Sequence, residues 1–317
     1  MAIVKHPKTT PEACTDAFPH EGYWVQSVEG LGRMSYSAGI SPMFKLLSSA
    51  ETEPHCGEYG GTNVEIAEGW EGIPKTAFKN GKKGPLSEVY SSMLSMPNKA
   101  SDAMRTKVMN ALPKSIRSML VEQTKWNDRM GEISLDRLFS GQRLFMRKRM
   151  TGEQNIPVFG IGVPIQANAN INSDIISIRA VVCALAVEIL EGRGIPCEVF
   201  AVSYCANQYR TGESGIQAVR VKKAGEVMAT SSIMNLMSGW AFRTAFFGMI
   251  RYGGTDVSSG YGQARQMPEN QCTALGLTLP NLDGFAMLNT RPETNNTNKA
   301  TEEAIAELVR VVTPFMA

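Results

Sequence analysis

The feature that most constrains the fold is a strand–helix–strand pattern between residues 156 and 204. Residues 156–165 form a short, nearly all-apolar run, typical of a strand buried on both faces. Residues 173–191 predict a helix that is apolar nearly all round, as expected where a helix is covered on several sides. A second apolar run follows at 196–204. Because a helical crossover joins parallel strands, the pattern predicts a parallel sheet.

The remaining patterns of the second half extend this sheet. Residues 217–223 alternate apolar and basic side chains, which favours an exposed edge strand. A Met- and aromatic-rich helix is expected over 231–252, a last strand over 285–289 and an amphipathic helix over 301–312. We therefore expect an α/β fold class, an open and mostly parallel sheet with helices on both faces.

The chain divides into three predicted parts. The length of 317 residues allows two domains, or one large domain with an extension. Since 43% of the residues are apolar, the chain can bury a sizeable core. Residues 1–61, rich in Gly, Pro, Ser and Thr, predict an irregular N-terminal arm. Residues 62–152 predict a mainly helical, basic segment, including a helix over 100–112 that Pro113 ends. The α/β domain is expected over 153–317.

The net charge of +2 conceals opposite charges along the chain. Residues 1–74 hold 4 basic and 10 acidic side chains, whereas residues 75–149 hold 16 basic and 6 acidic ones. Clustered basic residues can track a phosphate backbone, but they also occur on solvated helix faces or pair with an acidic arm. The candidate surface for nucleic acid or a protein partner comprises Lys82, Lys83, Arg143, Arg147, Lys148 and Arg149.

No targeting or membrane segment is expected. The first 20 residues have no apolar run of signal-peptide length, and no stretch reaches about 18 apolar residues without charge. The six cysteines have no framework spacing, so reduced thiols are expected. These patterns predict a protein in a cytoplasm, without membrane contact.

Several segments resemble the von Willebrand A-like (vWA-like) domains of intracellular and bacteriophage-encoded proteins. The main one is INSDIISIRAVVCALAVEILEGRGIPCEVFAV at 171–202, whose first helix carries an arginine, Arg179, in an apolar run as those domains do. TNVEIAEGWEG at 62–72 and ISLDRLFSGQRLFMRKRM at 133–150 are similar to pieces that precede the domain in phage proteins. The resemblance, which covers parts of 62–150 and most of 156–317, implies a vWA/Rossmann-like sheet and a host-cell or virion location.

The resemblance also implies a Mg²⁺ site at the carboxyl end of the first strand, formed by an Asp-x-Ser-x-Ser loop with a Thr and an Asp. Here Pro164 stands at the Asp position, and neutral amides follow with period two. A hard dication needs at least one carboxylate, so we expect a degenerate site that satisfies buried backbone groups or binds a partner by hydrogen bonds. The candidate binding residues are Gln166, Asn168, Asn170, Asn172 and Asp174.

Catalytic patterns are weak. All three histidines, His6, His20 and His55, precede the α/β domain, which disfavours a nucleophile–histidine system within it. Gly160 and Gly162 are too few glycines for a dinucleotide fingerprint, and no P-loop is present. Cys14, His20, His55 and Cys56 have an uncommon spacing for zinc, so exposed histidines and buried thiols are the simpler interpretation.

The leading hypothesis is a non-enzymatic protein-interaction or structural protein, phage-encoded, without a cofactor or bound metal. Its partners would be other protein subunits, with a homo-oligomer as one form. Two alternatives stay open. One is a nucleic-acid-binding protein that uses residues 75–149, and the other is a Mg²⁺-dependent adhesion module or hydrolase that uses Asp174, Asp256 or Asp283.

Overall fold

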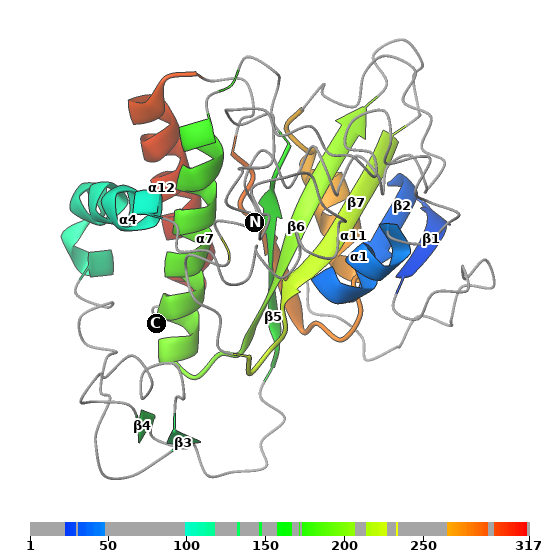
Figure 1. The fold of residues 1–317 in the computed structure, drawn as a ribbon, viewed down its shortest axis with the longest axis horizontal. Coiled ribbons are helices and arrows are strands. Elements are labelled where there is room, and N and C mark those ends of the chain that lie inside the picture. Colours follow the sequence, from blue (N-terminus) through cyan, green and yellow to red (C-terminus); the bar gives the residue numbers. More distant parts are fainter. Residues whose placement is uncertain are drawn as a thin grey trace, which may run out of the picture.

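The structure is a computed structural model. It describes residues 23–29, 31–47, 99–117, 132–133, 146–147, 157–166, 171, 173–206, 214–226, 233, 265–290 and 295–315. The strands are β1 (Tyr23–Val28), β2 (Gly32–Ser37), β3 (Glu132–Ile133), β4 (Met146–Arg147), β5 (Phe159–Pro164), β6 (Cys197–Ala206), β7 (Ser214–Lys222) and β8 (Gly284–Met287) (Figure 1). The helices are α1 (Ile40–Leu47), α4 (Lys99–Ala111), α7 (Ser173–Gly192), α11 (Glu269–Thr278) and α12 (Thr297–Val312), and a 3₁₀ turn, η3 (Thr313–Phe315), follows α12.

Six strands form one mixed sheet in the order β1-β2-β7-β6-β5-β8, and β3 and β4 form a separate antiparallel pair. β6, β5 and β8 run parallel to one another, β7 is antiparallel to β6, and β2 is parallel to β7. β1 closes the order as the antiparallel partner of β2. The expected α/β class and mostly parallel sheet are thus confirmed. Three of the five strand pairs in this sheet are parallel, and β6, β5 and β8 form a continuous parallel group at one side of the sheet.

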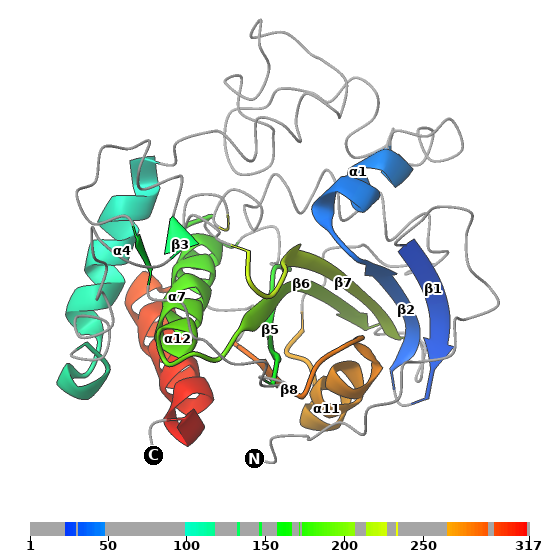
Figure 2. The ribbon, with the colours of Figure 1, turned by 90° about the horizontal axis from the view of Figure 1, so that it is seen from below.

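Helices cover both faces of the sheet (Figure 2). α7, α12 and α4 contribute to one apolar cluster, into which β5 directs Ile161 and Val163. α11 lies on the opposite face, where a second cluster includes Leu275 of that helix, Phe200 of β6 and Phe285 of β8. The alternation of neighbouring β-strand residues between the two clusters follows from the period of two of a strand.

The strand–helix–strand prediction is confirmed at the position where it was strongest. β5 is buried along its whole length, α7 spans nearly the predicted range, and β5 and β6 pair in parallel from Phe159↔Cys197 onward. The last strand and helix are also present as β8 and α12. α12 begins at Thr297 rather than at residue 301, because the Asn296 side chain accepts hydrogen bonds from the backbone N–H groups of Asn298 and Lys299. The helix expected over 231–252 lies outside the described residues apart from Ile233.

The prediction of β7 as an exposed edge strand is wrong. β7 lies between β2 and β6, and its basic side chains are neutralised inside the structure. Arg220 pairs with Glu198 of β6 at 3.4 Å. Lys222, only 2% exposed, donates from Nζ to Glu191 Oε1 at 2.6 Å. Alternating charge therefore marks ion pairs with β6 and α7 here rather than a solvated edge.

The irregular arm expected over residues 1–61 is corrected for residues 23–47. These residues form the β1–β2 hairpin and α1, and β2 pairs in parallel with β7. Trp24 and Tyr36 stack across the hairpin with ring centroids 5.0 Å apart. The hairpin therefore extends the sheet of the predicted α/β domain, which no local pattern in the arm indicates.

The described part of the basic segment contains α4, as predicted from the pattern over 100–112. Val108 and Leu112 are buried in the cluster shared with α7, and Met104 and Met109 pack against it. Across the helix pair, Arg105 donates from Nη1 and Nη2 to the two carboxylate oxygens of Glu188 on α7, both at 2.7 Å. Because its interaction is bidentate, this pair fixes the position of α4 on α7.

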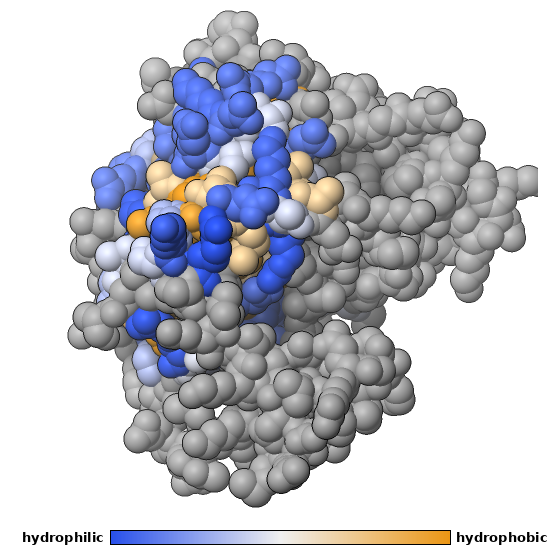
Figure 3. Space-filling view, turned by 90° about the vertical axis from the view of Figure 1, so that its left-hand side faces the viewer, coloured by the Kyte–Doolittle hydropathy of each residue, from blue (hydrophilic) through white to orange (hydrophobic). Residues whose placement is uncertain are grey.

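The surface on the α4 and α12 side is mainly hydrophilic among the described residues, with a small hydrophobic group between (Figure 3). This distribution is expected for amphipathic helices whose apolar faces meet α7. Among the described residues, no helix combines the length and apolar character needed to span a bilayer.

The glycines of β5 and α11 make room for Phe285. A Cβ on Gly162 would lie 2.6 Å from Phe285 Cζ, and one on Gly276 would lie 2.8 Å from Phe285 Cβ. A Cβ on Gly160 would lie 2.5 Å from Leu282 Cδ1. The Gly-x-Gly of β5 thus serves close packing of β8 and α11 on the sheet.

We expect Gly276→Ala to lower the free energy of unfolding by about 2 kcal/mol, because Cβ and Cγ of Phe285 cannot move away without disturbing β8. This loss should exceed the gain from the better helix propensity of alanine, about 1 kcal/mol. The matched control is Gly39→Ala, whose Cβ would meet only the Pro42 ring, with Cδ at 3.4 Å and Cγ at 3.9 Å. Urea unfolding monitored by circular dichroism measures both. Equal stability of the two variants would contradict the packing argument.

Candidate functional site

The carboxyl ends of β5 and β8 form the candidate site. In open α/β sheets, ligands bind outside the carboxyl ends of the strands. The carboxyl ends of the neighbouring parallel strands β5 and β8 lead to α7 and α12, which lie on the same face of the sheet, whereas α11, which precedes β8, lies on the opposite face. The carboxyl end of these two strands is therefore the expected place for a binding site.

Gln166 continues the hydrogen bonding of the sheet after β5 ends. Its side chain is 1% exposed, and its Oε1 accepts a hydrogen bond from the backbone N–H of Tyr204 in β6 at 3.1 Å. Its Nε2 donates to the carbonyl oxygen of Arg265 at 3.2 Å. At Gln166 the amide therefore satisfies buried backbone groups, which is the first of the two roles predicted for the amide row.

The side chain of Arg179, in the second turn of α7, forms hydrogen bonds with the end of β5. Its side chain is 2% exposed, and its Nη1 donates to the carbonyl oxygens of Gln166 at 2.9 Å and Pro164 at 3.4 Å. Burial lowers the pKa of the guanidinium to about 10, and Glu303 of α12 opposes this shift. The group is therefore cationic at neutral pH. A fixed positive charge therefore lies at the end of β5, where the vWA resemblance implies a metal.

The described residues at this edge do not fit a Mg²⁺ site. The Gln166 side chain is committed to backbone groups, and the cation of Arg179 would repel a second cation. Asp174 is exposed in the first turn of α7, where a carboxylate favours the helix dipole. Asp283 lies at the opposite, amino end of β5. There its Oδ2 accepts a hydrogen bond from the N–H of Val158 at 2.8 Å. Asp174 and Asp283 therefore cannot share a metal ion.

Several predicted site residues lie outside the described residues. They are Asn168, Asn170, Asn172, Asp256, the zinc candidates and the basic residues other than Arg147, namely Lys82, Lys83, Arg143, Lys148 and Arg149. Arg147 is in β4, and in the backbone register of the two strands it lies opposite Glu132 of β3. Within the described part of the chain, no group of three or more His, Cys, Asp or Glu side chains could hold a metal ion.

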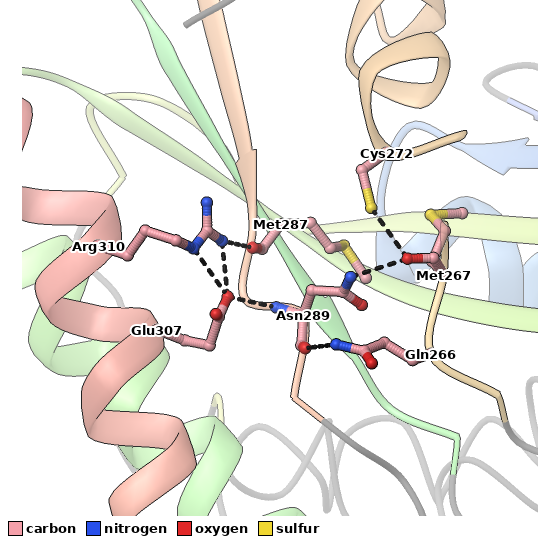
Figure 4. Close-up of polar contacts among 7 residues, drawn as sticks. All are labelled: Gln266, Met267, Cys272, Met287, Asn289, Glu307 and Arg310. Atoms are coloured by element: carbon pink, nitrogen blue, oxygen red, sulfur yellow. Dashed lines mark hydrogen bonds and ion pairs between the residues drawn. The ribbon is translucent and has the colours of Figure 1, made fainter. Parts of the chain in front are cut away.

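A charged pair on α12 binds the outer edge of β8 (Figure 4). The N–H of Leu288 donates to Gly162 O of β5, so the backbone groups of Met287 and Asn289 point the other way. Glu307 Oε2 accepts from the N–H of Asn289 at 3.0 Å, and Arg310 Nη2 donates to Met287 O at 2.5 Å. The pair makes the two hydrogen bonds that a further strand would make, and it protects this edge.

A pocket of about 440 Å³ opens beside this pair, between α11, α12 and the carboxyl end of β8. Its lining residues are Gln266, Met267, Pro268, Glu269, Cys272, Met287, Asn289, Glu307 and Arg310. Asn289 Nδ2 donates to Met267 O, and Gln266 Nε2 donates to Asn289 O, both at 2.8 Å. These two bonds hold the segment before α11 against the end of β8, so the pocket walls are fixed to the sheet (Figure 4).

Burial keeps three thiols, those of Cys183, Cys197 and Cys272, from activation for nucleophilic chemistry. Burial raises the pKa of Cys183 and Cys197 well above the ordinary value. At the pocket, burial raises the pKa of Cys272 to about 12, and its Sγ donates to Met267 O at 3.7 Å. A reactive cysteine has a lowered pKa, so Cys272 lines the pocket as an apolar group.

The pocket residues were not predicted from the sequence. Asn289 is the last residue of the predicted last strand, 285–289, so the rule on carboxyl strand ends identifies it as a candidate. Glu307 and Arg310 have the i, i+3 spacing of a helical ion pair. That they meet β8 and the 265–268 segment depends on tertiary packing, which no sequence signal reveals.

We expect Arg179→Met to lower the free energy of unfolding by about 2 kcal/mol, because the carbonyl groups of Pro164 and Gln166 lose a buried donor. Arg193→Met is the matched control, since Arg193 also donates to a carbonyl oxygen, that of Phe315, but at an exposed site. Its effect should stay within about 0.5 kcal/mol. Chemical denaturation compares the two, and a stable Arg179→Met protein would show that the guanidinium is dispensable.

We expect Cys272 in the folded protein to react with iodoacetamide at pH 8 at least about 100-fold more slowly than in the urea-unfolded chain, because so little thiolate is present. The rate should rise about tenfold per pH unit toward pH 10, since the pKa lies near 12. Peptide mass mapping after timed labelling measures this site separately from the other cysteines. A rate in the folded protein close to that of the unfolded chain would contradict the burial of the thiol.

Comparison with known proteins identifies the family. Neither the curated proteins nor the solved structures contain a significant match to this chain. A family model described as a domain of unknown function (DUF7192) matches residues 99–294, more than half of the 317 residues. The match includes Gln166, Arg179 and Asn289 and ends before α12. The chain belongs to the DUF7192 family.

Proposed function

We propose that this chain is a non-enzymatic protein-interaction or structural protein with a vWA-like domain, and that it binds other protein subunits at the carboxyl edge of its sheet. The observation that carries the proposal is the arrangement of Gln166 and Arg179. The end of β5, where the resemblance implies a metal, instead holds a buried amide and a buried cation. This arrangement favours a fixed surface over a reactive one.

Two further observations support docking rather than catalysis. The thiol at the edge, Cys272, has a pKa near 12 and is not a nucleophile at neutral pH. The pocket at the same edge is lined by both polar and apolar groups that hydrogen bonds hold in place. Pre-formed walls with apolar lining and a few placed polar groups are typical of binding sites. The similarity of 62–72 and 133–150 to pieces of phage proteins supports an assembly role, in a host cell or a virion.

The test is the mass of the full chain isolated with its native complex and again after purification alone. We expect a stoichiometric complex with other protein subunits, or a homo-oligomer. Glu269→Lys at the pocket should abolish the complex, whereas Glu226→Lys, an exposed carboxylate at the opposite edge, should leave it intact. A monomer without a partner would overturn the proposal.

Two outcomes of the same experiment would favour the alternatives instead. A complex that disappears with nuclease and weakens steeply with salt would indicate nucleic-acid binding. A melting temperature that rises with Mg²⁺ and falls with EDTA would indicate a metal-dependent module. Either result contradicts docking through a metal-free protein surface.

A further inference from the structure

The pocket between α11, α12 and β8 uses its amide donors, and two of the three guanidinium nitrogens of Arg310, internally. The amide nitrogens of Asn289 and Gln266 donate to backbone oxygens, and Arg310 donates from Nε and Nη2 to Glu307 Oε2 at 3.1 and 2.6 Å. The oxygen atoms of the same two amides accept no hydrogen bond from the described residues. The pocket therefore offers acceptors and needs donors.

The charge of the pocket also favours a hydrogen-bond donor, and specifically a cation. Glu307 and Arg310 neutralise each other at 2.6 Å, which leaves the carboxylate of Glu269 without a cationic partner among the described residues. Glu269 lies in the first turn of α11, where it offsets the partial positive charge of the helix start. A ligand cation therefore meets amide oxygens and a carboxylate rather than an exposed helix dipole.

The remaining lining is apolar. Met267 and Met287 are both 2% exposed, and Pro268 and Cys272 complete this part of the pocket. Thioethers adapt to the shape of a flexible hydrocarbon. Such a wall suits an aliphatic chain that carries its charge at the tip.

We propose that this pocket binds a lysine side chain of the partner subunit, with the ammonium on the oxygens of Gln266, Asn289 and Glu269 and the methylene chain on Met267 and Met287. An ammonium is a compact head with three donors, which matches three separate acceptors. A guanidinium presents its donors in a planar fork that suits one carboxylate in bidentate geometry, whereas the acceptors here are divided between two amides and one carboxylate. The proposal rests on the proposed function in that the lysine comes from a protein.

The test uses the full chain with ¹³C-methyl methionine and the probe Nα-acetyl-lysine methylamide, with the neutral Nα-acetyl-norleucine methylamide as control. Met267→Leu and Met287→Leu assign the two pocket signals. We expect the lysine probe alone to shift both signals saturably at millimolar concentration, and less so at high salt. No shift, or an equal shift with the neutral probe, would overturn the proposal, as would a shift with Nα-acetyl-glutamate methylamide.

Matched variants locate the binding site. Glu269→Gln should weaken binding of the lysine probe about threefold, as expected for one partly exposed charge, whereas Glu226→Gln should not change it. Both residues are exposed, so neither variant should affect folding. Equal effects of the two variants would show that the probe responds only to net charge, and would overturn the assignment. Probe binding without a native complex would contradict the proposed function alone, and a complex without probe binding would contradict the lysine pocket alone.

Discussion

The contact of Arg179 and Gln166 with the end of β5 is the interaction on which the other features of the site depend. A central parallel strand that stops inside a protein leaves backbone groups that must find partners. Here the guanidinium of Arg179 binds the carbonyl groups of Pro164 and Gln166, and the side chain of Gln166 binds the N–H of Tyr204 in β6 and the carbonyl group of Arg265. These buried hydrogen bonds connect the end of β5 to α7, to β6 and to the 265–268 segment.

Polar side chains also bind backbone or charged groups of neighbouring elements at the outer edge of β8 and along α7. Glu307 and Arg310 take the place of a further strand at the end of this four-residue strand, where they bind the N–H of Asn289 and the carbonyl oxygen of Met287. Three charged residues of α7 contact other elements. Besides Arg179, Glu188 binds α4 and Glu191 binds β7. A helix that is apolar nearly all round thus carries the specific contacts that position its neighbours.

Local patterns predicted the centre of this fold and failed where partners are distant in sequence. β5, α7 and β6 were predictable because burial on all sides leaves continuous apolar runs. β7 was assigned to an edge because alternation cannot distinguish solvent from the carboxylates of Glu191 and Glu198, which supply the environment of Lys222 and Arg220. Gln166 was predictable as a residue at a strand end, whereas the pocket required knowledge of where α12 meets β8.

The distribution of satisfied and unsatisfied groups separates the two halves of the candidate site. At β5 the side chains are buried, and their hydrogen bonds go to the protein's own backbone, so this half can support a surface but has little to offer a ligand. At β8 the donors are used internally while amide oxygens and the carboxylate of Glu269 line an open pocket. Recognition therefore belongs to the β8 half, and its excess of acceptors selects a cationic partner. The β5 half holds that pocket in place.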